Sequence, residues 1–367
     1  MAGGAFPARR RPRVMAQPAA KPVPAAAIDE RIARVGVLAR LFQRPEIGSF
    51  VGVVAVFLLF LVTAPGFDFA ALDGIARWSD EASNIGIMAV PVALLMIGGE
   101  FDLSAGVMTG SSGLLLAYLA THAGWNVWPA IAVVLVFGLL VGLLNGLLVT
   151  KTGLPSFIVT LATFFSLQGL NLGLTAHVTG SVYISDVDSA PGYSFARRLF
   201  GSTFWSPHDF TVRVIWWIGI TALGMWILTR TRVGNWIFAA GGDKVAARNV
   251  GVPVTRTKIG LFMTTSTMAS LLGIMVTIQL RSSQAGQGIG REFEYIIAAV
   301  VGGCLLTGGY GSAIGASIGA LIMGMATIGI PFAGWNSNYR ALFLGIILLL
   351  AVLLNTIIRH QAERARR

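Results

Sequence analysis

Long apolar runs separated by short polar stretches dominate the chain from residue 47 onward. A helix that crosses a bilayer needs about 17–25 mostly apolar residues, and most of these runs reach or approach that length. The pattern therefore predicts an all-α polytopic membrane protein with about ten transmembrane helices. We expect these helices at 47–64, 83–99, 103–121, 127–150, 154–175, 213–229, 259–280, 295–310, 312–331 and 340–358.

Two places in this pattern are interrupted by glycines. Gly98 and Gly99 precede the polar residues Glu100 and Asp102, and the segment GGCLLTGG occupies 302–309. A broken helix is tolerated at membrane depth only where it lines protein or a water-filled cavity. We expect a broken helix at both places. The first place carries two carboxylates beside its glycines, whereas the second carries only Thr307 as a polar residue.

The composition excludes several classes of protein. Charged residues make up 12% of the 367-residue chain and hydrophobic residues 55%, whereas soluble domains carry roughly 25% charged residues. A single cysteine, Cys304, excludes an internal disulfide and a multi-cysteine metal site. The chain has neither a GxxxxGK[ST] loop nor histidines at metal-ligand spacing. We expect no enzyme active site, metal site or cofactor in this chain.

The distribution of Lys and Arg predicts the orientation in the membrane. With the N-terminus inside, the inner segments hold nine in 1–46, Lys151, six in 230–258 and four in 359–367, which is 20 of the 27. Such an excess is typical of cytoplasmic loops, so both termini are predicted to be cytoplasmic. The net charge of +11 then reflects membrane topology, and nucleic acid is not expected as a partner.

The chain divides into three predicted regions. Residues 1–46, rich in Pro, Ala and Arg, are predicted to be a disordered basic cytosolic tail that contacts anionic lipid. Residues 47–358 form the transmembrane permease domain, and 359–367 form a second basic cytosolic tail. The long outer loop 176–212 suits either docking of an external protein or a lid.

A short polar segment, GDKVAARNVGVPV at 242–254, lies in the inner loop 230–258. Asp243 can cap a helix start, Gly251 suits the left-handed position after a helix, and Pro253 prevents continuation. The result is a predicted helix of about two turns, which is marginal by itself because nucleation is costly. We expect it to dock into another protein; the alternative is a helix resting on lipid headgroups.

This segment resembles the Ala-Ala-x3-Gly coupling loop of ABC importer permeases. The runs GGEFDLSAG (98–106), LPSFIVTLATFFSLQGL (154–170) and FEYIIAAVVGGCLLTGGYGSAIGASIGALI (293–322) resemble the ribose/xylose/inositol branch of sugar permeases. The resemblance covers roughly 45–358 and implies a type II-like ABC importer permease fold. It departs from the family pattern at Val245, where a Glu is usual, and at Gln168, where many relatives have Arg.

The resemblance also implies partners and a coupling site. The short helix would fit a cleft on an ATPase with two nucleotide-binding domains, which binds ATP and Mg itself. A periplasmic or extracytoplasmic sugar-binding protein would deliver substrate, and two copies of the permease would form the pathway. Ala246 and Ala247 would supply a small buried face of the helix. The residues carried over to the coupling site are Asp243, Lys244, Ala246, Ala247, Arg248, Asn249 and Gly251.

Glu100 and Asp102 are candidates for the substrate pathway. A charge at the bilayer centre costs about 2.5–3.5 kcal/mol, so such residues face a cavity or protein. One interpretation is a polar patch on the sugar path; the other is a tight cytosolic turn between two spans. Four polar residues in or near spans complete the candidate pathway set: Ser104, Thr160, Gln168 and Asn171.

Pattern and resemblance together predict the permease subunit of an ATP-driven importer for a monosaccharide or polyol, such as ribose, xylose or inositol. Its expected location is the bacterial cytoplasmic (inner) membrane. The competing class is a proton- or ion-coupled secondary transporter that would use Asp102, because such carriers place coupling carboxylates near the midplane.

Overall fold

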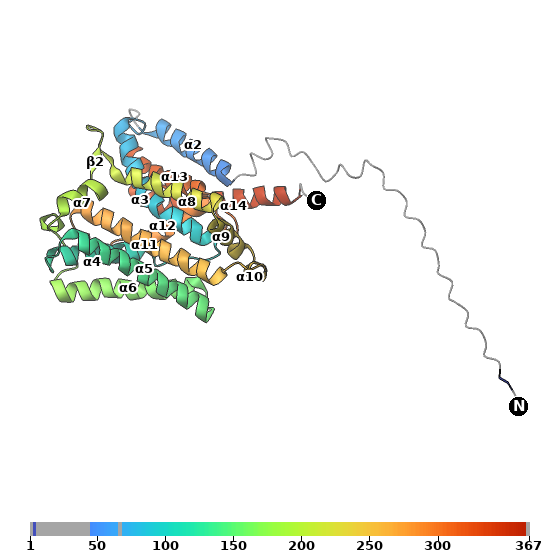
Figure 1. The fold of residues 1–367 in the computed structure, drawn as a ribbon. Helices are drawn as coiled ribbons and strands as arrows, with labels where there is room; N and C mark the ends of the chain where they lie inside the picture. The colour runs from blue at the N-terminus through green and yellow to red at the C-terminus, as the bar shows by residue number, and fades with distance from the viewer. Residues whose placement is uncertain (1–2, 5–44, 65–67, 365–367) are drawn as a thin grey trace. The chain divides into compact units, whose positions relative to one another are not determined.

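The computed structural model describes residues 3–4, 45–64 and 68–364, and the side chains of this part outside 45–47 and 354–364. The tail predicted at 1–46 falls almost wholly outside the described residues. At the other end, helix runs on to Arg364, through most of the segment 359–367. Figure 1 shows the arrangement of the elements.

The described part is built almost entirely of helices. Their bounds are α2 Pro45–Thr63, α3 Leu72–Ile97, α4 Ala105–Thr121, α5 Val127–Thr152, α6 Ser156–Thr179, α7 Tyr193–Phe200, α8 Val212–Arg230, α9 Arg232–Gly242, α10 Lys244–Asn249, α11 Val254–Leu280, α12 Arg291–Val301, α13 Ala313–Phe332 and α14 Arg340–Arg364. Strand β1 (Tyr183–Ile184) pairs antiparallel with β4 (Ser283–Gln284), and β2 (Thr203–Phe204) with β3 (Phe210–Thr211). Short 3-10 turns lie at Val187–Ser189 and Ser337–Tyr339.

Six described helices are long and apolar enough to cross a membrane: α3, α5, α6, α8, α11 and α13. Shorter apolar helices lie at Gly48–Thr63, Ala105–Thr121 and Ser337–Leu353. The all-α polytopic class is therefore confirmed, but the count of ten spans is not. The helix expected at 295–310 is wrong, because α12 ends at Val301 and Gly303 takes a φ of 92° that reverses the chain.

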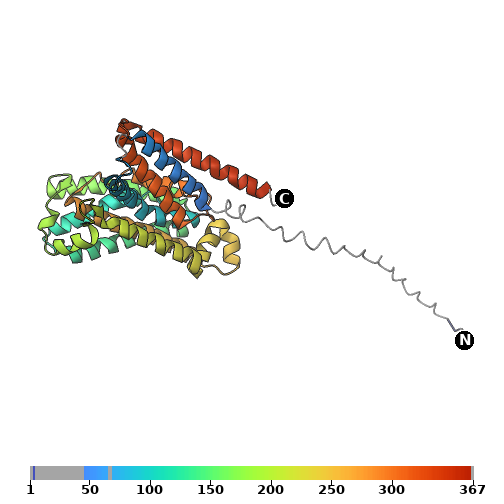
Figure 2. The ribbon, with the colours of Figure 1, turned by 90° about the horizontal axis from the view of Figure 1, so that it is seen from above.

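Helix α11 packs against α4 and α5, and α3 packs against α8, α12 and α13. Small residues allow close approach between α5 and α11: a Cβ on Gly142 would lie 2.5 Å from the carbonyl oxygen of Phe262. Close backbone packing through glycine is typical of membrane helices. Helix α2 lies beside α13 and α14, as the view from above shows (Figure 2).

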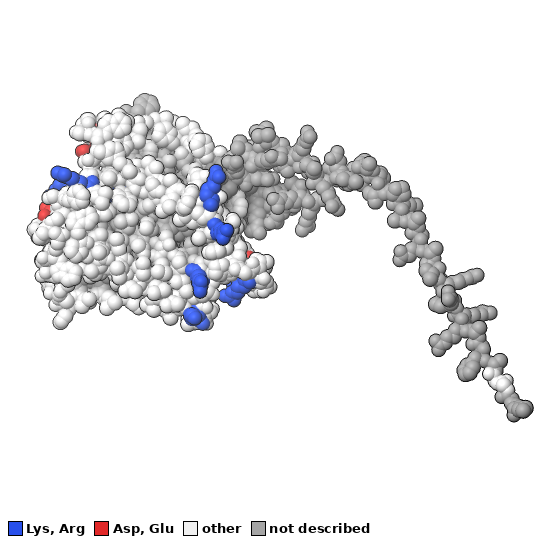
Figure 3. Space-filling model, viewed as in Figure 1, with Lys and Arg blue, Asp and Glu red and all other residues white. Residues whose placement is uncertain are grey.

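The bundle has two distinct ends. Helix α7 and strand β2 lie at one end and α10 at the other (Figure 1). The outer loop predicted at 176–212 begins after Thr179 and is folded, with α7 and the β2–β3 hairpin inside it. On the face drawn in Figure 3, Lys and Arg gather towards the α10 end, and the broad middle carries neither sign of charge.

Candidate coupling and pathway site

Helix α10 has the start and stop that the sequence predicts. The carboxylate of Asp243 accepts hydrogen bonds from the backbone N–H groups of Val245 (2.9 Å) and Ala246 (3.0 Å). The helix is six residues long, and after it Gly251 takes a φ of 87° while its N–H donates to the carbonyl of Arg248. These two amide bonds lower the pKa of Asp243 below its usual value.

The two alanines of α10 face different ways. Ala247 is 4% exposed and packs against Ala240 of α9 and Val254 of α11. Ala246 is exposed. The expectation that both alanines lie on one small buried face is therefore wrong for Ala246: only Ala247 is buried, and it packs α10 against its own chain. Two apolar residues are also exposed at this helix: Val245 (60% exposed) and Val250 (79% exposed), the residue that follows its last turn.

The chain reverses after α3 in a Schellman turn. Gly99 has a φ of 80° and its N–H donates to the carbonyl of Met96, while the N–H of Glu100 donates to that of Leu95. These bonds satisfy carbonyls at the helix end, and the left-handed position strongly favours glycine.

The end of α12 repeats this turn. Gly303 has a φ of 92° and its N–H donates to Val300, while the N–H of Cys304 donates to Ala299. The helix breaks expected at both glycine-rich segments are thus present, with the same cap.

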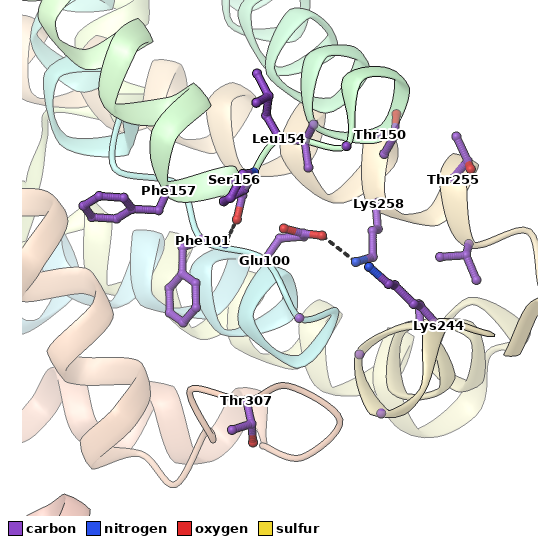
Figure 4. Close-up of a pocket in the computed structure, with 18 of the residues that line it drawn as sticks. Glu100, Phe101, Thr150, Leu154, Ser156, Phe157, Lys244, Thr255, Lys258 and Thr307 are labelled. Carbon is purple, nitrogen blue, oxygen red and sulfur yellow. Dashed lines mark hydrogen bonds and ion pairs between the residues drawn. The ribbon is translucent and has the colours of Figure 1, made fainter. Parts of the chain in front are cut away.

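A cavity of about 620 Å³ lies between the turn after α3, the α5–α6 connection and α10. Glu100 lines it and forms an ion pair with Lys258 of α11, whose Nζ is 2.5 Å from the Glu100 Oε1. Figure 4 shows Lys244 and Lys258 both pointing towards Glu100. Among the described residues that line the cavity, Glu100 is the single carboxylate, against Lys244, Arg248 and Lys258. The cavity is therefore basic.

Asp102 and Ser104 do not line this cavity; they hold the turn together. Asp102 is 1% exposed, and its Oδ1 accepts from the backbone N–H (2.8 Å) and the hydroxyl (2.5 Å) of Ser104. The Ser104 hydroxyl accepts in turn from the amide of Asn145 on α5. Thr160 of α6 accepts from the N–H of Leu103 at 3.0 Å. This geometry favours a tight turn for these residues over an open polar patch.

The remaining pathway candidates lie apart from this turn. Gln168 and Asn171 are two and three turns further along α6 than Thr160, and the cavity is lined by neither. Asn171 is buried, and within the described residues its side-chain nitrogen has no hydrogen-bond partner. Of the six candidates, only Glu100 faces the cavity.

Two residues at the site were missed in the sequence. Lys258 pairs with Glu100, and Ser156 accepts from the N–H of Phe101 at 3.1 Å. Lys258 directly precedes the apolar run 259–280, and this position was a usable signal because a charge at the edge of the membrane needs a partner or water. Ser156 had no comparable signal, since its role depends on a contact with a distant turn.

Comparison with known proteins identifies the family of this chain. Residues 74–352 match the family described as "Branched-chain amino acid transport system / permease component". The chain belongs to this family. It is therefore a membrane permease component of a transport system, with several apolar helices that fit a multi-pass protein.

Several relatives of this chain are named as permeases, and some of those names include a sugar. The chain is 31% identical to the ribose import permease protein RbsC of Escherichia coli K12 over 81% of this chain and 90% of that protein. It is 30% identical to the xylose transport system permease protein XylH of the same strain, over 84% and 91%. The probable ABC transporter permease protein YphD, also of that strain, is 32% identical over 88% and 92%. No solved structure matches the chain.

Proposed function

We propose that this chain is the membrane-spanning subunit of an ATP-driven importer for a monosaccharide or polyol of the ribose, xylose or inositol kind. The names of the ribose and xylose relatives support this substrate class. Two copies form the pathway in the bacterial inner membrane, and an ATPase with two nucleotide-binding domains supplies the energy and binds the ATP and Mg.

The capped helix α10 is the observation that carries this proposal. A six-residue helix cannot hold its shape by local bonds alone. Here the Asp243 cap and the seat of Ala247 fix it, while Lys244, Ala246, Arg248 and Asn249 remain exposed. An exposed, fixed lever of this kind suits docking into a cleft of the ATPase.

The α10 end is the cytoplasmic end in this proposal. Lys and Arg gather there on the face drawn in Figure 3, as cytoplasmic surfaces of membrane proteins require. Both termini are then cytoplasmic, and the folded segment with α7 faces outward, where a sugar-binding protein docks. ATP binding closes the ATPase domains, moves α10, and turns the pathway outward; hydrolysis resets it.

Isolation of the chain from its native membrane in mild detergent, with mass spectrometry of what accompanies it, tests the proposal. We expect an ATPase with two nucleotide-binding domains, and its loss with Ala246→Asp, which places a charge on the exposed side of α10. Recovery of the chain without any ATPase in several detergents would contradict the proposal.

A further inference from the structure

Glycines from three distant parts of the chain meet at one point beside the cavity. They are Gly99 after α3, Gly241 at the end of α9, and Gly308 and Gly309 in the loop between α12 and α13; we call these four residues the glycine junction. The N–H of Gly309 donates to the carbonyl of Ile97, the last residue of α3, at 2.8 Å. The loop between α12 and α13 is thus bonded directly to the end of α3.

Gly241 lies between the other two turns with no room for a side chain. A Cβ on Gly241 would lie 1.8 Å from the carbonyl oxygen of Ile97 and 2.8 Å from the nitrogen of Gly309. A Cβ on Gly308 would lie 2.8 Å from the Cα of Gly99. Contacts this short do not occur, so the three segments touch backbone to backbone.

Gly241 lies close to α10 in the sequence. Gly241 is followed by Gly242 and then by Asp243, the residue that caps α10. Two residues therefore separate α10 from a point that touches the end of α3 and the α12–α13 loop. Packed backbone has no rotamers with which to absorb a displacement, so a shift of α10 must move these turns or part them.

Both broken helices end in a Schellman turn, and the turn after α3 is part of the junction. Its Gly99 lies in the left-handed region. Left-handed residues at helix ends are where a chain can change direction at low cost, because glycine has no Cβ to clash. The junction thus joins α10 to the turn after α3 and, through Gly308 and Gly309, to the loop that follows α12.

We propose that the glycine junction passes the movement of α10 to the end of α3 and to the α12–α13 loop, with Gly241 as the positioning residue of the transport step. The proposal rests on the proposed function and adds to it the route of coupling inside the permease. Lys258 and Glu100 also connect the segment after α10 to the turn after α3, but they do so through flexible side chains. The junction makes its connection through packed backbone, which is rigid.

The test compares Gly241→Ala with Gly242→Ala in the complete transporter reconstituted with its ATPase and sugar-binding protein. Gly242 is the matched control, because a Cβ there meets nothing within 4 Å. We expect Gly241→Ala to lower sugar uptake by roughly tenfold while ATP hydrolysis changes by less than about twofold, a coupling loss of ordinary size. Gly242→Ala should leave both rates unchanged.

A second, milder variant covers the case in which Gly241→Ala does not assemble. A Cβ on Gly99 would lie 3.2 Å from the Cα of Gly241, so Gly99→Ala strains the junction from the other side. It should also separate hydrolysis from uptake. Normal uptake in the assembled variants, or uptake and hydrolysis falling in parallel, would overturn the junction proposal. A wild-type chain that binds no ATPase would overturn the proposed function instead.

Discussion

The ammonium of Lys258 and the carboxylate of Glu100 lie 2.5 Å apart and join the start of α11 to the turn after α3. The two residues are 158 positions apart in the chain. Both side chains are largely buried, at 10% and 13% exposed. The pair therefore ties the segment that follows α10 to the first broken helix.

Removal of one member of this pair should destabilise the protein. Lys258→Met leaves a buried carboxylate without its partner, and breaking such a pair costs about 3–5 kcal/mol. We expect a clear fall in the thermal unfolding temperature in detergent and a loss of uptake. The double variant Lys258→Met with Glu100→Gln should recover much of the stability. As a matched control, Arg281→Gln removes an exposed pair with Asp188 at 3.4 Å and should have little effect.

Asp243 should make the docking helix sensitive to acid. The pKa of Asp243 is lowered by its bonds to the amides of Ala246 and Val245. Its contribution to α10 is therefore present above the pKa of the unfolded chain and is lost as pH falls through the lower, folded value. Binding of the ATPase, measured by co-purification between pH 7 and strongly acidic conditions, should weaken over that range.

Asp243→Asn is the informative control for this pH effect, because Asn also caps helices but carries no charge. The variant should bind the ATPase at neutral pH with a flatter acid dependence. An unchanged pH profile would remove Asp243 as the cause.

The two alanines of α10 should respond differently to a charge. Ala247→Asp places a carboxylate among Ala240 and Val254, so α10 should lose its seat. Ala246→Asp leaves the seat intact, because this residue is exposed. Limited proteolysis of the α9–α11 connection should accelerate only in Ala247→Asp, while ATPase binding falls in both. Equal protease resistance in the two variants would contradict the inward position of Ala247.

Gly251 should tolerate only glycine well. Its φ of 87° lies outside the range that proline can adopt, and its N–H bonds the carbonyl of Arg248 at 3.0 Å. We expect Gly251→Pro to abolish uptake while insertion into the membrane stays normal. Gly251→Ala meets no atom within 4 Å and should cost about 1 kcal/mol of backbone strain only. Gly260→Ala, also in open space but in α11, should behave as wild type.

The features that could be predicted from the sequence are those that depend on residues close together in the chain. The cap at Asp243 and the stop at Gly251 depend on neighbours within a few residues, so the bounds of α10 follow from the segment itself. The long apolar helices are similarly local. The glycine pairs at 98–99 and 302–303 also announced the breaks, although the apolar run 295–310 hid how short α12 is.

Features that depend on distant segments could not be predicted in the same way. The inward position of Ala247 arises from packing against α9 and α11, and α10 by itself would permit either face. The partner of Glu100 lies on another helix, and Asp102 turns to its own Ser104. Sequence identifies residues that need a partner, whereas the fold decides which partner each one receives.

The matched caps of α3 and α12 place Glu100 and Cys304 at the same position of two equal turns. Glu100 borders the cavity, whereas Cys304 is 1% exposed and does not line it. The first cap therefore carries a charged residue beside a cavity, and its counterpart carries a buried thiol. Occupancy of this cavity should affect the turn after α3 directly and the turn after α12 only through the rest of the fold.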